Sequence, residues 1–507
     1  CARALGDLIM RPLLTIIFFV YGVCYASEHA EQRAKLLENE SLLAVGGEII
    51  LSDKEATVSN CLMKHKFKEV DYAFDNPEYF NFSNHFFSYK GTIKNSKVYK
   101  IIKDMPKGAA LHVHDMAILG PDYLIEVTYL PDLYVCFEKN NVQLRFNERL
   151  PTSPCNGRWQ LMSDARQSSN NVTKFDIELR KHFTLVVEDP DVEYPTIKDT
   201  WSTFMKYFIT VAPMLSYRPI WEKYFYDALK KFREENIMYV EVRSVLPNLY
   251  ELDGTVYDQV VTAKAYRKSI NRFKKDYPDF LGAKLIFAPS RFVNTYQVDE
   301  YLKVAKDIKG VMPEIFAGFD LVGQEDLGNP LIEFEPQLTA AGNQINYFFH
   351  AGETDWYGTF TDENLVDAIL LGAKRIGHAY ALPKHPLLLK EIIERDIGLE
   401  VNLISNVVLS LVRDMRNHPL SAFLAQGLPV VLSSDDPGAW EADLISDDFY
   451  VAFVGVASRL SDLRLLKKLA LNSIRYSALG SQEKIDALIA YNTKWNSFID
   501  NFDCSKY

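Results

Sequence analysis

The sequence predicts an α/β fold, namely a (β/α)8 TIM barrel with an N-terminal helical extension and an insertion between strands 1 and 2. Short apolar runs alternate with longer amphipathic helical segments, a pattern typical of parallel βαβ units. Eight such runs occur, at 110–114, 238–244, 284–290, 315–323, 346–352, 374–380, 398–406 and 429–436. Their polar residues gather at the C-terminal ends of the runs, which form the catalytic face of such a barrel.

The composition excludes several classes of protein. The 507 residues are 48% hydrophobic and 24% charged, which does not fit a disordered chain, a collagen or a coiled-coil rod. Lysine and arginine total 56 against 67 aspartates and glutamates, so the net charge is -11. An acidic chain repels phosphate backbones, and we therefore expect no nucleic-acid partner, although a small nucleoside or nucleotide remains compatible with this charge.

The N-terminal segment is interpreted as a leader. Arg11 precedes the apolar run 13–23, and the small residue Ala26 follows shortly after it. These features are typical of a secretory signal peptide, and the run is too short for a stable membrane anchor. We therefore expect a signal peptide at 10–26, an upstream or non-native segment at 1–9, no membrane anchor, and a secreted, extracellular protein. The alternative is a buried amphipathic helix at the N-terminus.

Four cysteines follow this leader, an even number, as expected of a secreted chain. Cys136 and Cys155 lie 19 residues apart in a stretch rich in turn residues, and could close a small loop. A disulfide across such a loop stabilises the fold by ~3 kcal/mol, because it restricts the unfolded chain. Cys61 and Cys504 are then left as the second pair.

Three N-x-S/T sequons begin at Asn39, Asn81 and Asn171. Three sequons are near the number expected by chance in a chain of this length. Together with a signal peptide, however, they predict glycosylation at these positions.

Two segments accompany the predicted barrel, which we place at 101–507. Residues 27–100 are polar and helical in pattern, and predict a helical N-terminal region. The first two apolar runs are roughly 125 residues apart, whereas later ones follow at about 25 to 45 residues, so the chain carries an insertion at 120–200. Pro-Asp and Asn-Gly turn signals predict an irregular insertion, and both Cys136 and Cys155 lie within it.

Histidines at the strand ends indicate a metal site. His112 and His114 alternate on the first predicted strand, so both imidazoles point the same way and can hold one ion, although a polar strand end is the simpler interpretation of this pair alone. His350 ends the fifth run and Asp435 the eighth, which neighbours strand 1 in a closed barrel. This donor set also suits iron or manganese, but we favour one Zn²⁺ per subunit because hydrolysis needs a Lewis acid without redox change.

Three further side chains lie near these ends. Glu353 follows His350 by three residues and could move protons without binding the metal, or could be a glutamate at a helix N-terminus. His378 ends the sixth run, and alone would be read as structural. Asp436 could cap a helix, or could bind substrate while Asp435 holds the metal. Because four strand ends offer such groups together, a catalytic site is favoured over coincidence.

Five motifs together resemble those of adenosine deaminases: MPKGAALHVHD, GFDLVGQED, FFHAGET, RIGHAY and SSDDPG. The long N-terminal region, the cysteine-bearing insertion and the signal peptide resemble the secreted branch, the adenosine deaminase-related growth factors. The resemblance implies a zinc site formed by His112, His114, His350 and Asp435. It also implies that Glu353 protonates the purine N1 and that His378 orients and helps deprotonate the attacking water.

Substrate-binding roles are implied in the same way. Asp436 matches the residue that contacts purine N7, and the backbone N–H of Gly323 matches the one that meets N3. Asp115 and Trp201 resemble residues that hold the ribose. The chain departs from the family at Ser290, where some relatives carry a histidine that touches the ribose. It also departs at 402–406, where the family often has Cys-Pro before Ser-Asn.

The resemblance implies a secreted zinc-dependent adenosine deaminase. Its reaction is the hydrolytic deamination of adenosine and 2′-deoxyadenosine to inosine and 2′-deoxyinosine, with release of ammonia. The family also implies a homodimer formed through residues 27–100 and growth-factor activity through adenosine depletion, and the insertion could bind a cell-surface receptor or glycan. Two alternatives remain: an extracellular signalling protein with a vestigial barrel, and an amidohydrolase that acts on another purine, such as AMP or adenine.

Overall fold

The computed structural model describes residues 28–139 and 141–507. The predicted signal peptide at 10–26 and the segment 1–9 lie outside the described residues. Within the described part of the chain, every helix is too short or too polar to cross a membrane.

Eight parallel strands form the centre of the molecule, and each of the eight predicted runs overlaps one of them. They build two four-stranded sheets, in the orders β1-β5-β6-β7 and β11-β10-β9-β8. The strands are β1 Gly108–His114, β5 Ile237–Ser244, β6 Gly282–Phe287, β7 Phe316–Phe319, β8 His350–Ala351, β9 Arg375–His378, β10 Gly398–Val401 and β11 Val430–Leu432. The predicted α/β fold with parallel strands is therefore confirmed.

The strands are buried almost along their whole length, as expected for parallel sheets covered by helices on the outside. Isolated parallel bridges join the edges of the two sheets, Val113 to Asp435 on one side and Phe319 to Tyr347 on the other. The C-terminal ends of the strands from both sheets therefore come close together.

One predicted strand is shorter than expected. The run 398–406 is a strand only to Val401, and α16 (Leu403–Val408) begins directly after Asn402. The backbone N–H of Asn406 donates to the carbonyl oxygen of Asn402 at 3.1 Å, which is a helical turn. Apolar residues on both sides of this segment are buried, so hydrophobicity alone did not reveal the change from strand to helix.

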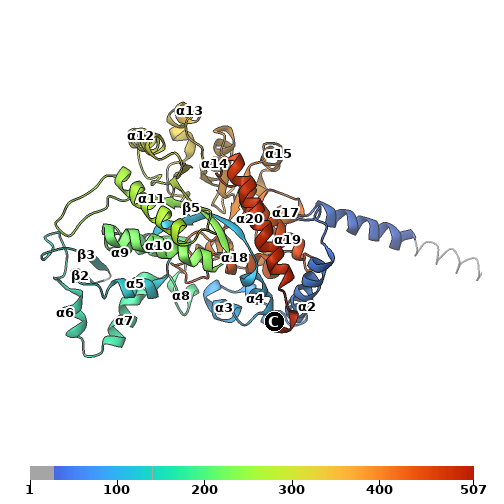
Figure 1. Cartoon of the computed structure of the whole chain (residues 1–507), viewed down its shortest axis with the longest axis horizontal. Helices are drawn as coiled ribbons and strands as arrows, with labels where there is room; N and C mark the ends of the chain where they lie inside the picture. The colour runs from blue at the N-terminus through green and yellow to red at the C-terminus, as the bar shows by residue number, and fades with distance from the viewer. Residues whose placement is uncertain (1–27, 140) are drawn as a thin grey trace, which may run out of the picture.

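Helices follow the strands and cover the sheets (Figure 1). Several begin at side-chain caps; α12, for example, starts at a capping box formed by Asn294 and Gln297. Besides α16, the α-helices that follow β5 are α11 Gln259–Asp276, α12 Thr295–Val311, α13 Glu335–Ala341, α14 Phe360–Leu370, α15 Pro386–Glu394, α17 Leu420–Ala425, α18 Ser446–Tyr450, α19 Leu463–Arg475 and α20 Ser481–Asp500.

The segment between β1 and β5 forms a lobe whose outer part, with β2, β3 and α6, lies at the left of Figure 1, while its last helix, α10, packs against β5 and α11. The lobe contains an antiparallel sheet in the order β3-β2-β4. This sheet was not predicted, because the turn signals in the sequence indicated an irregular insertion. Cys136 on β2 is bonded to Cys155, the predicted pair. Its elements are α5 Pro121–Val127, β2 Leu133–Phe137, β3 Val142–Phe146, β4 Trp159–Leu161, α6 Met162–Gln167, α7 Val172–Arg180, α8 Pro190–Glu193, α9 Ile197–Leu215 and α10 Arg218–Glu234.

The N-terminal segment is helical and is tied to the C-terminus. A helix over 28–43 projects from the molecule, and α2 (Asp53–Asp75), α3 (Phe86–Ile93) and α4 (Lys97–Asp104) lead into β1 (Figure 1). Cys61 of α2 forms a disulfide with Cys504. Glu55 of α2 also accepts hydrogen bonds from Lys467 Nζ at 2.6 Å and Trp495 Nε1 at 2.7 Å.

Acidic side chains gather without full compensation where α18 meets α4. Asp447 is buried; its Oδ2 accepts from the backbone N–H of Asp443 at 2.8 Å, and its Oδ1 has no hydrogen-bond partner among the described residues. Burial, together with the charges of Asp443 and Glu235, raises the pKa of Asp447 from 3.8 to about 7. The folded protein therefore holds a proton that the unfolded chain releases.

This proton makes stability depend on pH. Because the pKa of Asp447 is higher in the folded state, its favourable contribution is complete below about pH 4 and is lost as the pH rises through about 7. We expect Asp447→Asn to melt at a higher temperature than the wild type above pH 7, with the difference narrowing as the pH falls toward 4. Melting temperatures measured across this range check it, with the exposed Asp486→Asn as control; parallel profiles for Asp447→Asn and the wild type would contradict the assignment.

Candidate active site

A cavity of about 340 Å³ opens at the C-terminal ends of the strands. Strand ends and the loops that follow them provide its floor, and α9 from the lobe between β1 and β5 provides one wall. Every predicted metal-binding, catalytic and substrate-binding residue lines it except His112, which lies beneath its floor. The lining includes His114, Asp115, Trp201, Gly323, His350, Glu353, His378, Asp435 and Asp436.

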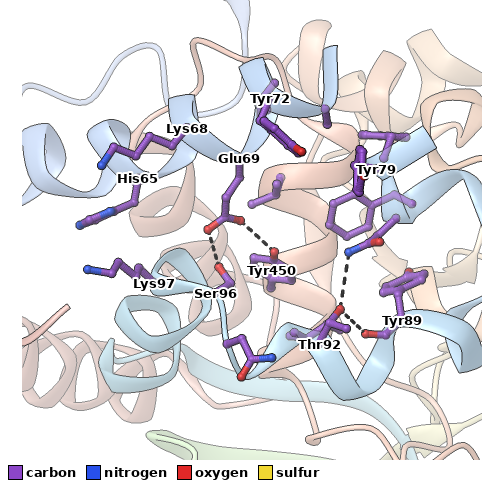
Figure 2. Close-up of a pocket in the computed structure, with 18 residues that line it drawn as sticks. His65, Lys68, Glu69, Tyr72, Tyr79, Tyr89, Thr92, Ser96, Lys97 and Tyr450 are labelled. Atoms are coloured by element: carbon purple, nitrogen blue, oxygen red, sulfur yellow. Dashed lines mark hydrogen bonds between the residues drawn. The ribbon is translucent and has the colours of Figure 1, made fainter. Parts of the chain in front are cut away.

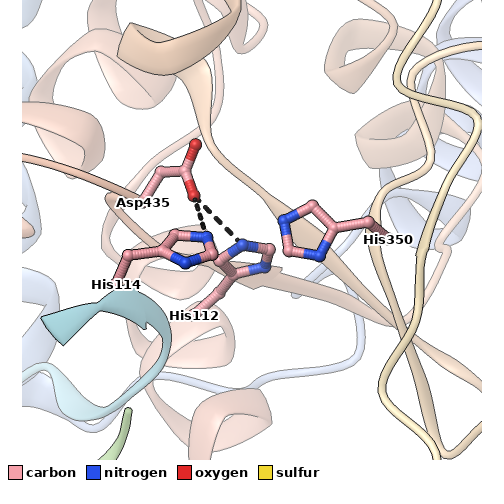
Figure 3. Close-up of side chains that lie close together, drawn as sticks. All are labelled: His112, His114, His350 and Asp435. Atoms are coloured by element: carbon pink, nitrogen blue, oxygen red, sulfur yellow. Dashed lines mark ion pairs between the residues drawn. The ribbon is translucent and has the colours of Figure 1, made fainter. Parts of the chain in front are cut away.

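Three imidazoles and one carboxylate converge in this floor (Figure 3). One ligand atom from each of four residues lies within 4.8 Å of the others; the residues are His112, His114, His350 and Asp435. Asp435 Oδ1 is 3.1 Å from His112 Nε2 and 3.0 Å from His114 Nε2. Neither His112 Nε2 nor Asp435 Oδ1 has a hydrogen-bond partner within the described chain, although both are buried. Buried donor atoms aimed at one point without partners fit a metal ion.

Buried carboxylates fix the orientation of two of these imidazoles. Glu400 Oε2 lies 2.7 Å from His112 Nδ1, and Asp320 Oδ2 lies 2.6 Å from His350 Nδ1. Each carboxylate occupies the nitrogen on the far side of its ring, which leaves Nε2 free to face the cluster centre. Burial lowers the pKa of His350 to about 4, so the ring is neutral, as a metal ligand must be.

The two carboxylates depend in turn on buried arginines. Arg243 donates to Asp320 Oδ2 at 2.8 Å and to Glu400 Oε2 at 2.7 Å, and Arg375 donates to Glu400 Oε1 at 2.5 Å. Burial opposes ionisation of Glu400, but the Arg243 and Arg375 charges hold its pKa well below the ordinary range. Arg375 also donates to a third carboxylate, that of Glu241, at 2.6 Å. We call these five side chains the buried ion network.

Glu353 presents a free carboxyl oxygen to the cavity. The backbone N–H groups of Gly352 and Glu353 donate to the Glu325 carboxylate at 3.1 and 3.2 Å, which positions this turn outside any helix. Glu353 Oε1 has no hydrogen-bond partner among the described groups and lies 3.3 Å from His378 Nδ1. Burial, and then the charge of Asp435, raises the pKa of Glu353 well above its ordinary value, so the group is poised as a proton donor.

His378 is held beside Glu353 and the metal cluster. It has a positive φ of 63°, which is strained for a residue with a side chain, and directs the ring from the end of β9 into the cavity. Asn406 Nδ2 lies 3.3 Å from His378 Nδ1, and His378 Nε2 is 3.8 Å from Asp435 Oδ2. Burial lowers its pKa well below 6.5, so the imidazole is neutral.

The predicted substrate-binding residues differ in whether their polar atoms already have hydrogen-bond partners. Asp436 Oδ1 is buried without a hydrogen-bond partner in the described part of the chain. Asp115 is already engaged, because its oxygens accept from Tyr266 OH and from the backbone N–H of Met116, both at 2.7 Å. Gly323 has a φ of +112°, and a Cβ there would lie 2.9 Å from the Phe292 ring, so the turn requires glycine.

Several predicted features lie away from this cavity. The Cys136–Cys155 disulfide belongs to the antiparallel sheet of the lobe. The sequon residues Asn39, Asn81 and Asn171 are all exposed. Neither the buried ion network nor Glu325 was predicted from the sequence. The available signal was a charged residue inside an otherwise apolar strand, which must have a partner when buried.

A second cavity, of about 490 Å³, lies between α2, the segment 79–97 and α18 (Figure 2). Its carboxylate, Glu69, accepts from Ser96 Oγ at 2.7 Å and from Tyr450 OH at 2.9 Å, so both oxygens are occupied. One lining residue, His65, belongs to a group of three possible metal ligands, but the other two, Cys61 and Cys504, are joined to each other in a disulfide. We therefore take the cavity at the strand ends as the active site.

The site combines three chemical capacities. Four donors can hold a divalent metal ion, a neutral carboxyl can deliver a proton, and a neutral imidazole can accept one. Together they suit the metal-assisted addition of water to an electrophilic carbon.

Comparisons with known proteins agree with this geometry. The family model described as adenosine deaminase matches residues 173–491, and the model for the N-terminal region of adenosine/AMP deaminases matches 20–102. The adenosine deaminase of Aedes albopictus is 41% identical over 475 residues, covering 92% of this chain and 88% of the relative. Adenosine deaminase 2 of Homo sapiens is 39% identical over 499 residues, covering 96% and 97%.

Solved structures share the fold at low sequence identity. The N6-mAMP deaminase of Arabidopsis superposes with a TM-score of 0.56 at 16% identity, covering 78% of this chain and 99% of that one. The adenine deaminase of Arthrobacter aurescens superposes with a TM-score of 0.54 at 20% identity, covering 77% and 99%.

The carboxylate behind His112 gives a prediction for metal binding. Glu400→Gln removes the charge that orients His112 and leaves Arg243 and Arg375 undercompensated, so we expect zinc affinity to fall by about 10- to 100-fold. Competition with a chromophoric chelator measures this, and circular dichroism reports whether the variant folds. Glu394→Gln, on the surface of α15, is the matched control. A folded Glu400→Gln protein with wild-type affinity would show that the contact is not needed to hold the metal.

Proposed function

The chain belongs to the adenosine deaminase family, alongside the adenosine deaminase 2 proteins, and is an adenosine deaminase; we propose that it is a secreted, zinc-dependent form. Its reaction is the hydrolysis of adenosine and 2′-deoxyadenosine to inosine and 2′-deoxyinosine, with release of ammonia. The observation that carries the proposal is the convergence of four metal-donor side chains at the floor of one cavity, where His112 Nε2, Asp435 Oδ1 and Oε1 of the proton donor Glu353 lack hydrogen-bond partners within the described chain.

We propose that the two parallel sheets are the halves of one closed (β/α)8 barrel. The bridges Val113–Asp435 and Phe319–Tyr347 support this, because they lie at the two seams between the sheets. On this basis residues 101–507 form the deaminase barrel, 120–200 are an insertion within it, and 27–100 are an N-terminal extension.

One zinc ion per subunit fits the donor set of three imidazole nitrogens and one carboxylate oxygen. His112, His114, His350 and Asp435 would hold it, with Ser405 Oγ donating to the second oxygen of Asp435 at 2.8 Å. When bound, the ion acts as a Lewis acid that lowers the pKa of a water molecule toward neutrality.

Glu353 and His378 would donate and accept the protons of the reaction. Glu353 would donate its proton to N1 of the purine, which makes C6 electrophilic; the absence of a hydrogen-bond partner for its Oε1 within the described chain supports this role. His378, neutral and beside Asp435, orients the attacking water and accepts its proton. The resulting hydroxyl group adds at C6, His378 returns its proton to N6, the C6–N6 bond breaks and ammonia leaves. The C6 hydroxyl proton passes to Glu353, which leaves the C6 carbonyl of the product and restores the acid.

Ring and sugar binding are assigned to the remaining lining residues. Asp436 would contact N7 and the Gly323 backbone N–H would contact N3, so the adenine lies between them. Asp115 and Trp201 would face the ribose. Ser290 also lines the cavity, and its short side chain leaves open space where some relatives place a histidine.

Secretion and assembly are proposed on separate observations. Two disulfides favour an oxidising compartment, and exposed Asn39, Asn81 and Asn171 are accessible for glycosylation. The projecting helix 28–43 exposes four leucines, a face suited to pairing two chains as a homodimer; they are Leu36, Leu37, Leu42 and Leu43. Extracellular adenosine depletion would then be its route to growth-factor activity, and the lobe between β1 and β5 is the surface offered to a receptor or glycan.

A direct assay tests the function. We expect secreted protein to deplete adenosine, followed at 265 nm, and to lose this activity after treatment with a chelator, because the cluster supplies no Lewis acid without its metal. Zinc added back should restore the activity. Undiminished turnover by protein shown by elemental analysis to contain no metal would refute the metal-dependent mechanism.

The proton donor gives a second test. Glu353→Gln keeps the shape of the side chain but cannot deliver a proton, so we expect kcat to fall by about 10²- to 10⁴-fold. Zinc content should stay at the wild-type level, because Glu353 is not one of the four donors. Exposed Glu363→Gln, on α14, serves as the control. Sustained turnover by Glu353→Gln would exclude the assigned role.

A further inference from the structure

The wall of the active-site cavity contributed by α9 carries a substrate preference. Resting on the proposed function, we infer that the enzyme also deaminates adenine nucleosides whose 5′ group is apolar and uncharged, such as 5′-deoxy-5′-alkylthioadenosines, and that it excludes 5′-phosphorylated nucleotides.

The cavity has a defined depth axis. Its floor is buried, with His350 only 4% and Asp435 only 3% exposed. Its rim is open, since Ile209 is 64%, Phe292 50% and Met205 43% exposed while all three line the same cavity. The metal donors therefore lie at the bottom, and these apolar side chains surround the entrance.

The shape of the purine determines where along this axis the sugar lies. C6, the reacting carbon, lies at one end of the fused ring, and N9, which carries the ribose, lies at the other. With C6 held above the metal donors, the ribose and its 5′ substituent must lie toward the rim. The rim residues are thus the groups that meet whatever is attached at C5′.

The rim is apolar on both sides. Along α9 the lining residues recur on one helical face, which is the spacing of an amphipathic helix. They are Phe204, Met205, Phe208, Ile209 and Ala212. Val245 and Phe292 face the cavity from other segments. A methylthio or similar group at C5′ would leave water for apolar surface here, which is favourable.

A phosphate finds no counter-ion in this lining. Arg243 is the single lysine or arginine among the described residues that line the cavity, and it is 0% exposed. Its guanidinium is already bonded to Asp320 and Glu400 in the buried ion network. Lys206, next to Met205 in sequence, lines a different cavity together with Lys174 and Lys181. The charged phosphate would therefore lose hydration without gaining a partner.

Loss of the 5′ hydroxyl costs little in this site. A site built to hydrogen-bond a hydroxyl rejects the analogue that lacks it by about 10⁴-fold or more, whereas an apolar pocket discriminates weakly. Both oxygens of Asp115 already accept hydrogen bonds within the protein, from Tyr266 and Met116. Among the described residues that line the cavity, Ser290 is the single exposed polar side chain, so the rim offers few partners for a 5′ hydroxyl group.

Steady-state kinetics with three substrates test the inference. We expect kcat/KM for 5′-deoxy-5′-methylthioadenosine within about tenfold of that for adenosine, and kcat/KM for 5′-AMP lower by about 10³-fold or more. Calorimetric binding of the products 5′-methylthioinosine and 5′-IMP provides a readout independent of turnover, and should follow the same order. Turnover of adenosine with a methylthio analogue more than a hundredfold worse would overturn the inference and leave the deaminase assignment intact. Failure with adenosine itself would instead remove the proposed function.

A charge placed at the rim gives the matched variant. Ile209→Lys should raise the ratio of kcat/KM for 5′-AMP to that for adenosine by about three- to tenfold, because it adds a partly exposed cation where the phosphate would lie. Ile209→Gln, of similar length and uncharged, should leave this ratio near the wild-type value. Since Ile209 is largely exposed, both variants should keep the wild-type melting temperature. An unchanged ratio in folded Ile209→Lys would show that the 5′ group does not meet this face.

Discussion

The metal-binding geometry depends on charge buried beneath it. Arg243 and Arg375 are fully buried, and each is neutralised by carboxylates, including one from a strand that is not adjacent to its own, Asp320 for Arg243 and Glu241 for Arg375. Two of these carboxylates, Asp320 and Glu400, also hold the far nitrogens of metal-donor imidazoles. A buried charge that loses its partner is far more costly than a surface one. The strands that contribute to the network are therefore locked in one relative position, and the imidazoles are aimed by the same contacts that satisfy the arginines.

The cavity joins two parts of the chain with different roles. Its floor is made of strand ends and tight turns, including the strained backbone at His378 and Asp435, so the reacting groups sit at the buried centre of the fold. Its wall comes from α9, which lies in the lobe between β1 and β5. Chemistry is thus set by the strands, whereas selection at the open end is set by a helix that the barrel pattern does not require. Relatives could vary the helix that selects the substrate without disturbing the strand ends that carry the chemistry.

Much of this could be predicted from the sequence, for identifiable reasons. The alternation of His112 and His114, and the positions of His350 and Asp435 at the ends of apolar runs, predicted a cluster that the structure brings together. The network behind it was not predicted, because Glu400 and Arg243 sit in strands far apart in sequence, and their pairing depends on strand order. The antiparallel sheet of the lobe was missed since its strands are short and separated by turns. The role of the apolar face of α9 was not predicted, because nothing local in the sequence shows that Ile209 faces a cavity.

The Cys61–Cys504 bond has a consequence for how the molecule survives damage. It links residues 443 positions apart, so nearly the whole described chain is a covalent ring. A protease that cuts one loop between these two cysteines opens the ring but leaves a single molecule, and the fragments stay at high local concentration. Around the bond, α2 remains fastened to α19 and α20 through Glu55 and its partners. The chain therefore needs two cuts, not one, before any part of the ring can diffuse away.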